Sequence, residues 1–202
     1  MTNLSHAARC GKWISICFAT VAVSLSGARI STASDIASLT AQLSDARTSS
    51  RDIAMQIARL SKADPRAREY VVGRLPEMIS APTSDAWTNA VWLAGEMKVS
   101  EAIPSLAQAM SRPPFPAEPY VTGAVVRRLG HDIVAQALSR IGNPAIPAVV
   151  RLLERTDAKT RGRALAILVR IGTPAAREAL QDRLPNETNP GLRKYIRESL
   201  RS

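Results

Sequence analysis

A short turn motif that recurs along the chain constrains its fold more than any other feature. The copies are Ala-Asp-Pro-Arg-Ala at 63–67, Val-Ser-Glu-Ala-Ile-Pro at 99–104, Asn-Pro-Ala-Ile-Pro at 143–147 and Thr-Pro-Ala-Ala at 173–176. Intervals of 35, 44 and 30 residues separate the equivalent positions Pro65, Ser100, Pro144 and Pro174. Each copy lies between two stretches with helical apolar spacing. A repeat of this length is typical of solenoids built from stacked helix pairs.

The last complete repeat shows how the sequence defines one hairpin. Apolar residues at three- and four-residue steps predict a first helix over 158–171. Gly172 ends this helix, because glycine readily adopts the left-handed conformation that many helix C-termini need. We expect Thr173 to cap the second helix and Pro174 to occupy its first turn, where a missing N–H costs nothing. The turn at 142–144 repeats these signals one hairpin earlier.

The whole pattern predicts an all-α solenoid of about four helical hairpins followed by one terminal helix. Every predicted helix has a single apolar stripe, so a hairpin buries its stripes only against its neighbours. The terminal segment at 189–200 is polar and lacks a partner helix, as a capping element should. The repeat domain is expected over 34–202. It contains a proline-rich loop at 111–119, whose four prolines exclude a helix.

Two stretches of the chain resemble HEAT-like repeats of the phycobilisome-lyase type. They are Arg-Ala-Leu-Ala-Ile-Leu-Val-Arg-Ile-Gly-Thr-Pro-Ala-Ala at 163–176 and Gln-Ala-Leu-Ser-Arg-Ile-Gly-Asn-Pro-Ala-Ile-Pro-Ala at 136–148. Asp157 and Arg161 stand where the consensus of that family has Asp and Arg. The resemblance covers about residues 50–200 and implies a right-handed α-solenoid. It also implies a protein that binds other proteins rather than one that catalyses a reaction.

Residues 1–33 have the pattern of a secretory signal peptide. Arg9 and Lys12 precede an apolar run at 13–25, and small residues follow that run. The run is too short to span a bilayer, which needs roughly 20 apolar residues. We therefore expect the segment to direct export, to the periplasm or by secretion, and to be removed. An uncleaved N-terminal anchor, the protein's only contact with a membrane, is one alternative, and a mitochondrial transit segment is another.

The chain is moderately basic. Lys and Arg number 27 against 17 Asp and Glu, a formal net charge of +10. Removal of the signal segment, which holds three basic residues and no acid, leaves 24 against 17, a net charge of +7. A basic surface suits an anionic partner, and the alternative is an arginine-rich surface that is only solvated. Arginines such as Arg161 and Arg163 are expected to be solvated or to pair with nearby acids.

The second helix of each hairpin is expected to line the concave face of the solenoid and to supply partner contacts. The candidate contacts there are Arg74, Gln108, Arg151 and Gln181. Three aromatic residues are candidate anchors, namely Trp87, Trp92 and Phe115. By register Trp87 takes the place of Arg161, and one apolar stripe cannot easily bury both tryptophans. We expect the proline-rich loop to fold back on one indole, whereas a bare indole would mark a partner or membrane contact.

Residues that carry common enzyme chemistry are scarce beyond the signal segment. That part has one histidine, His131, and no cysteine, so a Cys/His zinc site is excluded there. No P-loop is present. We expect no catalytic residue, cofactor or metal, and a non-catalytic exported scaffold or adaptor that binds another protein.

Two other functions stay open at the level of the sequence. A bilin-lyase-like enzyme is suggested by the family resemblance alone. A basic nucleic-acid-binding helical-repeat protein is the other alternative, and it requires that the chain is not exported. The second helices carry charges of both signs, which disfavours nucleic acid because phosphate tracking needs a continuous positive potential.

Overall fold

The computed structural model describes residues 32–81, 84–111 and 132–201, and within these ranges the chain is helical and has no strand. The α-helices there are α1 (Thr32–Ser44), α2 (Arg51–Ala63), α3 (Pro65–Ser80), α4 (Asp85–Glu96), α5 (Ile103–Ala109), α6 (Ile133–Ile141), α7 (Ile146–Leu152), α8 (Ala158–Ile171), α9 (Pro174–Arg183) and α10 (Pro190–Arg201). Short 3-10 segments at Ser100–Ala102 and Asn143–Ala145 lead into α5 and α7, and a third follows α9 at Leu184–Asn186. The all-α prediction is confirmed.

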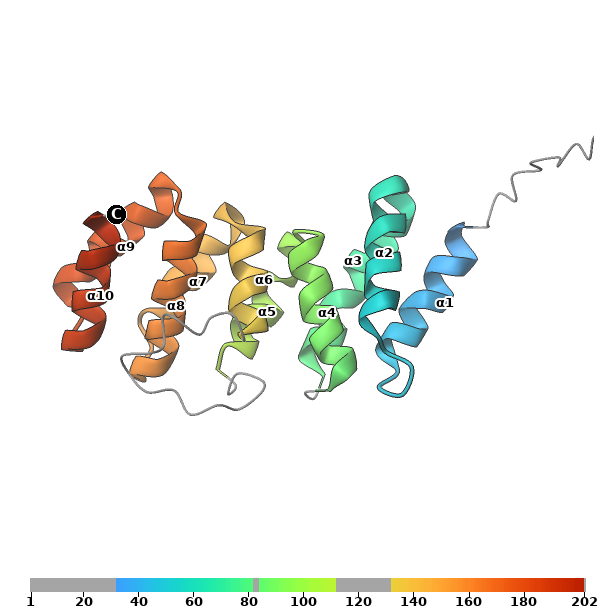
Figure 1. The fold of residues 1–202 in the computed structure, drawn as a ribbon, viewed down its shortest axis with the longest axis horizontal. Helices are drawn as coiled ribbons and strands as arrows, with labels where there is room; N and C mark the ends of the chain where they lie inside the picture. The colour runs from blue at the N-terminus through green and yellow to red at the C-terminus, as the bar shows by residue number, and fades with distance from the viewer. Residues whose placement is uncertain (1–31, 82–83, 112–131, 202) are drawn as a thin grey trace, which may run out of the picture.

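The helices form two layers along an elongated molecule (Figure 1). We call α2, α4, α6, α8 and α10 the first helices; they stand side by side, each in contact with the next. The second helices, α3, α5, α7 and α9, form the other layer in the same way. The predicted hairpins are therefore α2/α3, α4/α5, α6/α7 and α8/α9, and α10 is the predicted terminal helix. This confirms a solenoid of helical hairpins, while its right-handedness stays a prediction.

Helix α1 is an element that the repeat pattern did not predict. It contacts α2, α3 and α4 and covers the N-terminal end of the row of hairpins (Figure 1). Ile36 and Leu43 anchor it, since both side chains are buried in the common core. The helix begins two residues before the expected start of the domain at residue 34. Residues 1–31 lie outside the described ranges, so the signal peptide stays a prediction.

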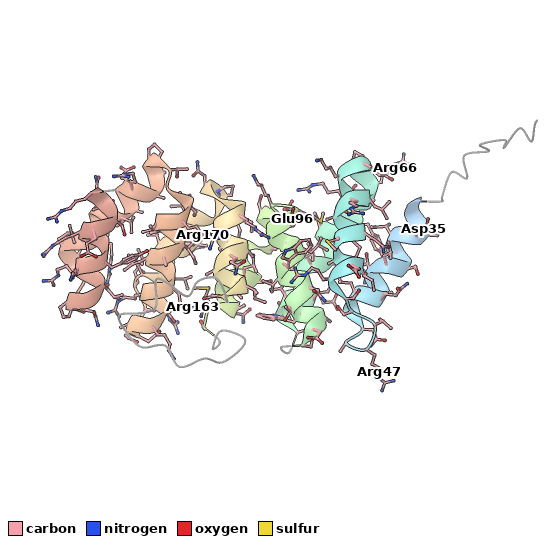
Figure 2. The ribbon with its side chains drawn as sticks, in the orientation of Figure 1. Asp35, Arg47, Arg66, Glu96, Arg163 and Arg170 are labelled. Atoms are coloured by element: carbon pink, nitrogen blue, oxygen red, sulfur yellow. The ribbon has the colours of Figure 1, made fainter. Side chains whose placement is uncertain are left out.

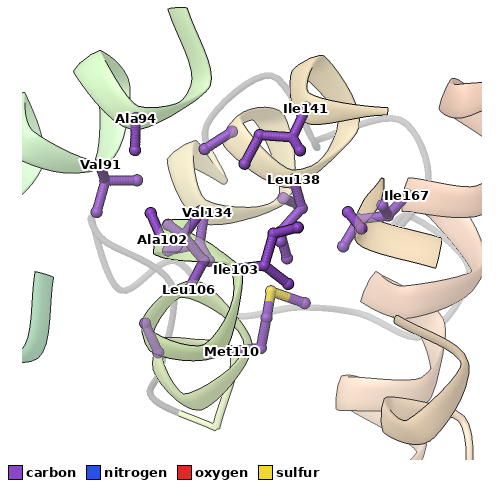
Figure 3. Packing of buried hydrophobic residues seen from close by; sticks show 14 of the residues in the cluster. Val91, Ala94, Ala102, Ile103, Leu106, Met110, Val134, Leu138, Ile141 and Ile167 are labelled. Atoms are coloured by element: carbon purple, nitrogen blue, oxygen red, sulfur yellow. The ribbon is translucent and has the colours of Figure 1, made fainter. Parts of the chain in front are cut away.

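The hydrophobic core is continuous from one hairpin to the next. Side chains of α4, α5, α6 and α8 belong to a single cluster, as Val91, Leu106, Leu138 and Ile167 illustrate (Figure 3). Helices α4 and α6 approach each other closely at Gly95, where an added Cβ would lie 2.7 Å from the Cα of Ala137. Because the stripes face neighbouring hairpins, each hairpin depends on the next one for its stability.

The predicted glycine turns are present. Gly142 and Gly172 have φ angles of 82° and 65°, a region that L side chains rarely adopt. Helix α8 has the predicted bounds, and at its start the carboxylate of Asp157 accepts a hydrogen bond from the N–H of Thr160 (2.7 Å). Local capping and turn signals therefore set the ends of this helix.

The prediction that the Thr173 side chain caps α9 is wrong. Thr173 occupies the N-cap position, but its side chain accepts no N–H of the helix. Its hydroxyl donates instead to the Oδ1 atom of Asn143, at 2.7 Å. This bond joins the equivalent turns of two successive hairpins, so the threonine connects repeats rather than stabilising a single helix.

Candidate functional site

A groove lies between α1, α3 and the start of α4. Its volume is about 590 Å³, within the range of about 300–1,000 Å³ that is common for ligand pockets. The lining residues are Thr40, Ala41, Ser44, Asp45, Tyr70, Arg74, Glu77, Met78, Ala81, Ser84, Ala86 and Trp87. The groove depends on α1, whose residues Thr40, Ala41 and Ser44 form one of its walls. We call it the α1–α3 groove.

Tyr70 and Arg74 form the most prominent feature of the α1–α3 groove. Tyr70 is 39% exposed, and in the part of the chain that the structure describes it is the one large hydrophobic residue classed as exposed. The guanidinium carbon of Arg74 lies 5.6 Å from the centre of the Tyr70 ring, one helical turn away. Such a cation–π contact holds both side chains in place at the surface. Tyrosine and arginine are also two of the residue types that dominate protein interfaces energetically.

The charges around the α1–α3 groove have both signs. Asp45 and Glu77 line it together with Arg74. The carboxylate of Asp45 accepts a hydrogen bond from the backbone N–H of Arg47 (2.9 Å), which restrains the start of the α1–α2 connection. A mixed rim around an apolar wall that includes Met78 suits a polypeptide segment, because complementary charges then orient the partner.

The predicted second-helix contacts are all exposed, but only one of them lines this groove. Arg74 belongs to it, whereas Gln108, Arg151 and Gln181 lie on α5, α7 and α9. A separate groove of about 350 Å³ between α7 and α9 is lined by Val150, Leu153, Glu154, Ala175, Glu178, Ala179, Asp182, Arg183 and Asn186. Arg151 and Gln181 are sequence neighbours of these lining residues and not members of them.

Trp87 is a core residue, so its prediction as an exposed anchor is wrong. Its side chain is 3% exposed, and its indole Nε1–H donates to the backbone carbonyl of Ile79 at 2.8 Å. Arg161, whose place it takes by register, donates to the carbonyls of Arg155 and Thr156 before its own helix. Both residues therefore bind the backbone that precedes a first helix, and the end of α3 provides the cover expected from the proline-rich loop.

Of the other two candidate anchors, the structure describes Trp92 but not Phe115. Trp92 is partly buried on α4, and the guanidinium of Arg51 lies 4.4 Å from the centre of its ring. Phe115 and all but the first residue of the loop at 111–119 lie outside the described ranges. Their predicted role in docking stays a prediction.

Arg161 is buried and paired rather than solvated. Its guanidinium forms two hydrogen bonds to the carboxylate of Glu187, at 3.1 and 2.9 Å, and Glu187 is fully buried. Arg183 donates to the same carboxylate at 3.2 and 3.0 Å. Burial alone would raise the pKa of Glu187, but hydrogen bonds from Arg161, the Asn189 N–H and Arg183 lower it to about 2. This network joins α8, the end of α9 and the start of α10.

Arg163 makes the second buried pair. Its guanidinium is bonded twice to the carboxylate of Asp132, at 2.6 and 3.0 Å, and also donates to the carbonyl of Met110. Arg163 and Asp132 are 2% and 1% exposed. The sequence suggested pairing with acids nearby in the chain. Asp132, however, is 31 residues from Arg163, and Glu187 is 26 residues from Arg161. No local pattern could have identified them.

The described part of the chain has few other functional signals. No group of three His, Cys, Asp or Glu side chains that could hold a metal ion occurs among the described residues. Within the same ranges, every helix is too short or too polar to cross a membrane. Tyr70 was missed by sequence reasoning, because a single tyrosine next to core positions gives no signal of exposure.

The C-terminal part of the chain matches a known family. Residues 117–201 match the family model described as HEAT repeats. The matched range includes α6 to α10, where the turns at Gly142 and Gly172 lie. No curated protein matches the chain.

Proposed function

The chain is a HEAT repeat protein, and from this premise we propose that it is a non-catalytic scaffold that binds another protein in the α1–α3 groove. HEAT repeats commonly mediate contacts between proteins. A solenoid provides a long surface on a fixed frame. Proteins with this fold differ in the side chains on that surface and therefore in what they bind.

The exposed pair Tyr70 and Arg74 beside the α1–α3 groove carries the proposal. The guanidinium lies 5.6 Å from the ring centre, so the cation–π contact reduces the side-chain entropy that is lost when a partner covers the two residues. Met78 adds an adaptable apolar wall, and Asp45 and Glu77 provide charges that orient the partner. The adjoining surface of α5, α7 and α9, with Gln108, Arg151 and Gln181, extends the contact.

Export is part of the same proposal. It rests on the pattern of residues 1–33, where basic residues, a short apolar run and small residues follow one another. The partner is then a protein of the periplasm or of the outside of the cell. The bilin-lyase-like alternative has the family resemblance alone in its favour. The acids Glu77 and Glu178 on second helices, and Glu154 just after α7, weigh against a nucleic-acid partner.

Site-specific photocrosslinking in the native cell tests this function. A photoreactive amino acid replaces Tyr70 in one version of the full chain and Lys62, an exposed residue near the end of α2, in the control version. We expect one partner protein to be crosslinked from position 70 and absent from position 62. The partner's affinity should then fall by about 2–4 kcal/mol in the Tyr70→Ala, Arg74→Ala double variant. Equal crosslinking from both positions, or an unchanged affinity, would contradict the proposal.

A further inference from the structure

A cationic strip crosses three first helices on a surface separate from the α1–α3 groove. Arg51, the first residue of α2, places its guanidinium 4.4 Å from the ring centre of Trp92 on α4. Within the described ranges no carboxylate pairs with Arg51. A guanidinium that lies flat on an indole keeps its N–H edge available for an acceptor.

Arg140 on α6 completes the strip. Its guanidinium contacts the carboxylate of Glu96 at 3.3 Å. Glu96, labelled in Figure 2, follows Trp92 by one helical turn on α4. The two side chains are 45% and 47% exposed, so this pair is a weak surface contact. Helix α4 packs between α2 and α6, which places Trp92 and Glu96 between the two arginines. The strip therefore has two cations and one anion.

The two arginines lie near each other, because Trp92 and Glu96, the residues that they contact, are one helical turn apart on α4. Burial lowers the pKa of Arg51, and the positive charge of Arg140 lowers it further. Glu96 contacts Arg140, and among the residues that the structure describes no carboxylate forms an ion pair with Arg51. An anion placed between the guanidiniums would remove this repulsion and accept hydrogen bonds from both.

We infer that Arg51 and Arg140 bind one oxyanion, a carboxylate or phosphate group, beside the indole of Trp92. Guanidinium groups recognise both oxyanions through paired N–H donors. The indole restrains Arg51 and offers the partner an apolar contact, a combination typical of interface hot spots. This gives the predicted contact residue Trp92 a definite role. None of the four residues lines the α1–α3 groove, so the inference stands independently of the proposed function.

Thermal unfolding of the full chain with defined anions tests the inference. Sodium phosphate and a hexaglutamate peptide are titrated separately, with sodium chloride holding the ionic strength constant. A ligand of the native state raises the unfolding midpoint, and the rise grows with the logarithm of its concentration once that exceeds the Kd. We expect a rise with at least one of the two anions. Its apparent affinity should be about tenfold weaker in Arg51→Gln and in Arg140→Gln, since each variant removes one charged donor.

Arg170→Gln is the matched control, because Arg170 is an exposed arginine on the first helix α8 and has the same charge change (Figure 2). This variant should keep the wild-type affinity. A response to phosphate alone identifies a phosphate group, and a response to the peptide alone identifies a carboxylate. The inference is overturned if neither anion raises the midpoint above the chloride value. It is equally overturned if Arg51→Gln or Arg140→Gln binds as the wild type does, or if Arg170→Gln loses as much affinity as they do.

Discussion

Replacement of Arg163 by methionine should be among the most damaging single changes in this protein. The chain leaves α5 at Met110 and enters α6 at Asp132, and the guanidinium of Arg163 binds both residues from α8. Asp132 also caps α6, because its Oδ1 atom accepts the N–H of Ala135 at 3.0 Å. One side chain thus connects three successive hairpins.

The size of the loss follows from burial. Arg163→Met keeps most of the side-chain volume but leaves the carboxylate of Asp132, 1% exposed, without its cationic partner. Removing one member of a buried ion pair costs about 3–5 kcal/mol, because the remaining charge is left in a low-dielectric interior. Domains of this size unfold with about 5–15 kcal/mol, so the variant should lose a large fraction of its stability.

Urea unfolding followed by far-ultraviolet circular dichroism measures the effect. Arg170→Met is the matched control, an exposed arginine on the same helix, and should stay within about 0.5 kcal/mol of the wild type. The double variant Arg163→Met, Asp132→Asn should lose less than the sum of the single losses, since the two residues interact directly. A loss below about 1 kcal/mol for Arg163→Met, or strictly additive losses, would refute the reasoning.

Three further predictions concern other parts of the molecule. Since the pKa of Glu187 is lowered from 4.5 to about 2, its pairing stabilises the fold fully above pH 4.5 and is lost as the pH falls towards 2. Glu187→Gln should therefore be about 3 kcal/mol less stable than the wild type at neutral pH and nearly as stable as the wild type near pH 2. Urea unfolding at the two pH values measures this difference. Gly95→Ala should cost about 1–3 kcal/mol, because its Cβ would meet the backbone of Ala137, whereas Gly73→Ala, with no atom within 4 Å, should stabilise α3 by about 0.5–1 kcal/mol; equal effects of the two variants in thermal unfolding would contradict this. Mass spectrometry of the native N-terminus should find Arg29 or Ser34 as the first residue, and an intact Met1 would argue for an uncleaved anchor.

The hairpins were predictable because their signals are local. Apolar spacing, an Asp before the helix and a glycine after it lie within one stretch of chain, and the bounds of α8 follow from them. The exposure of Arg74 and Arg151 was predictable for the same reason, since each adjoins the apolar stripe of its own helix. Helix α1 lacks the turn motif that identifies the other helices, so the repeat pattern said nothing about it.

The site depends on contacts that no local pattern contains. The α1–α3 groove exists because α1 lies against α3, and that placement brings Asp45 near Tyr70 and Arg74. The stacking of Arg51 on Trp92 joins residues of two hairpins in the same way. Trp87 shows the opposite error, in which a candidate anchor is buried and bonded to the end of the preceding helix.

The buried ion pairs explain how a solenoid with small apolar side chains keeps a defined shape. Interfaces of alanine, leucine and isoleucine tolerate small sliding movements, because dispersion contacts have little directional preference. The paired hydrogen bonds of Arg163 to Asp132 and of Arg161 to Glu187 do not, since each guanidinium matches its carboxylate in one orientation. The Arg163 pair connects α8 to the start of α6 in the preceding hairpin, and the Arg161 pair connects α8 to the segment between α9 and α10. The two pairs therefore add directional contacts to the apolar packing at the C-terminal end of the row, where they restrain α8 relative to α6 and to the start of α10.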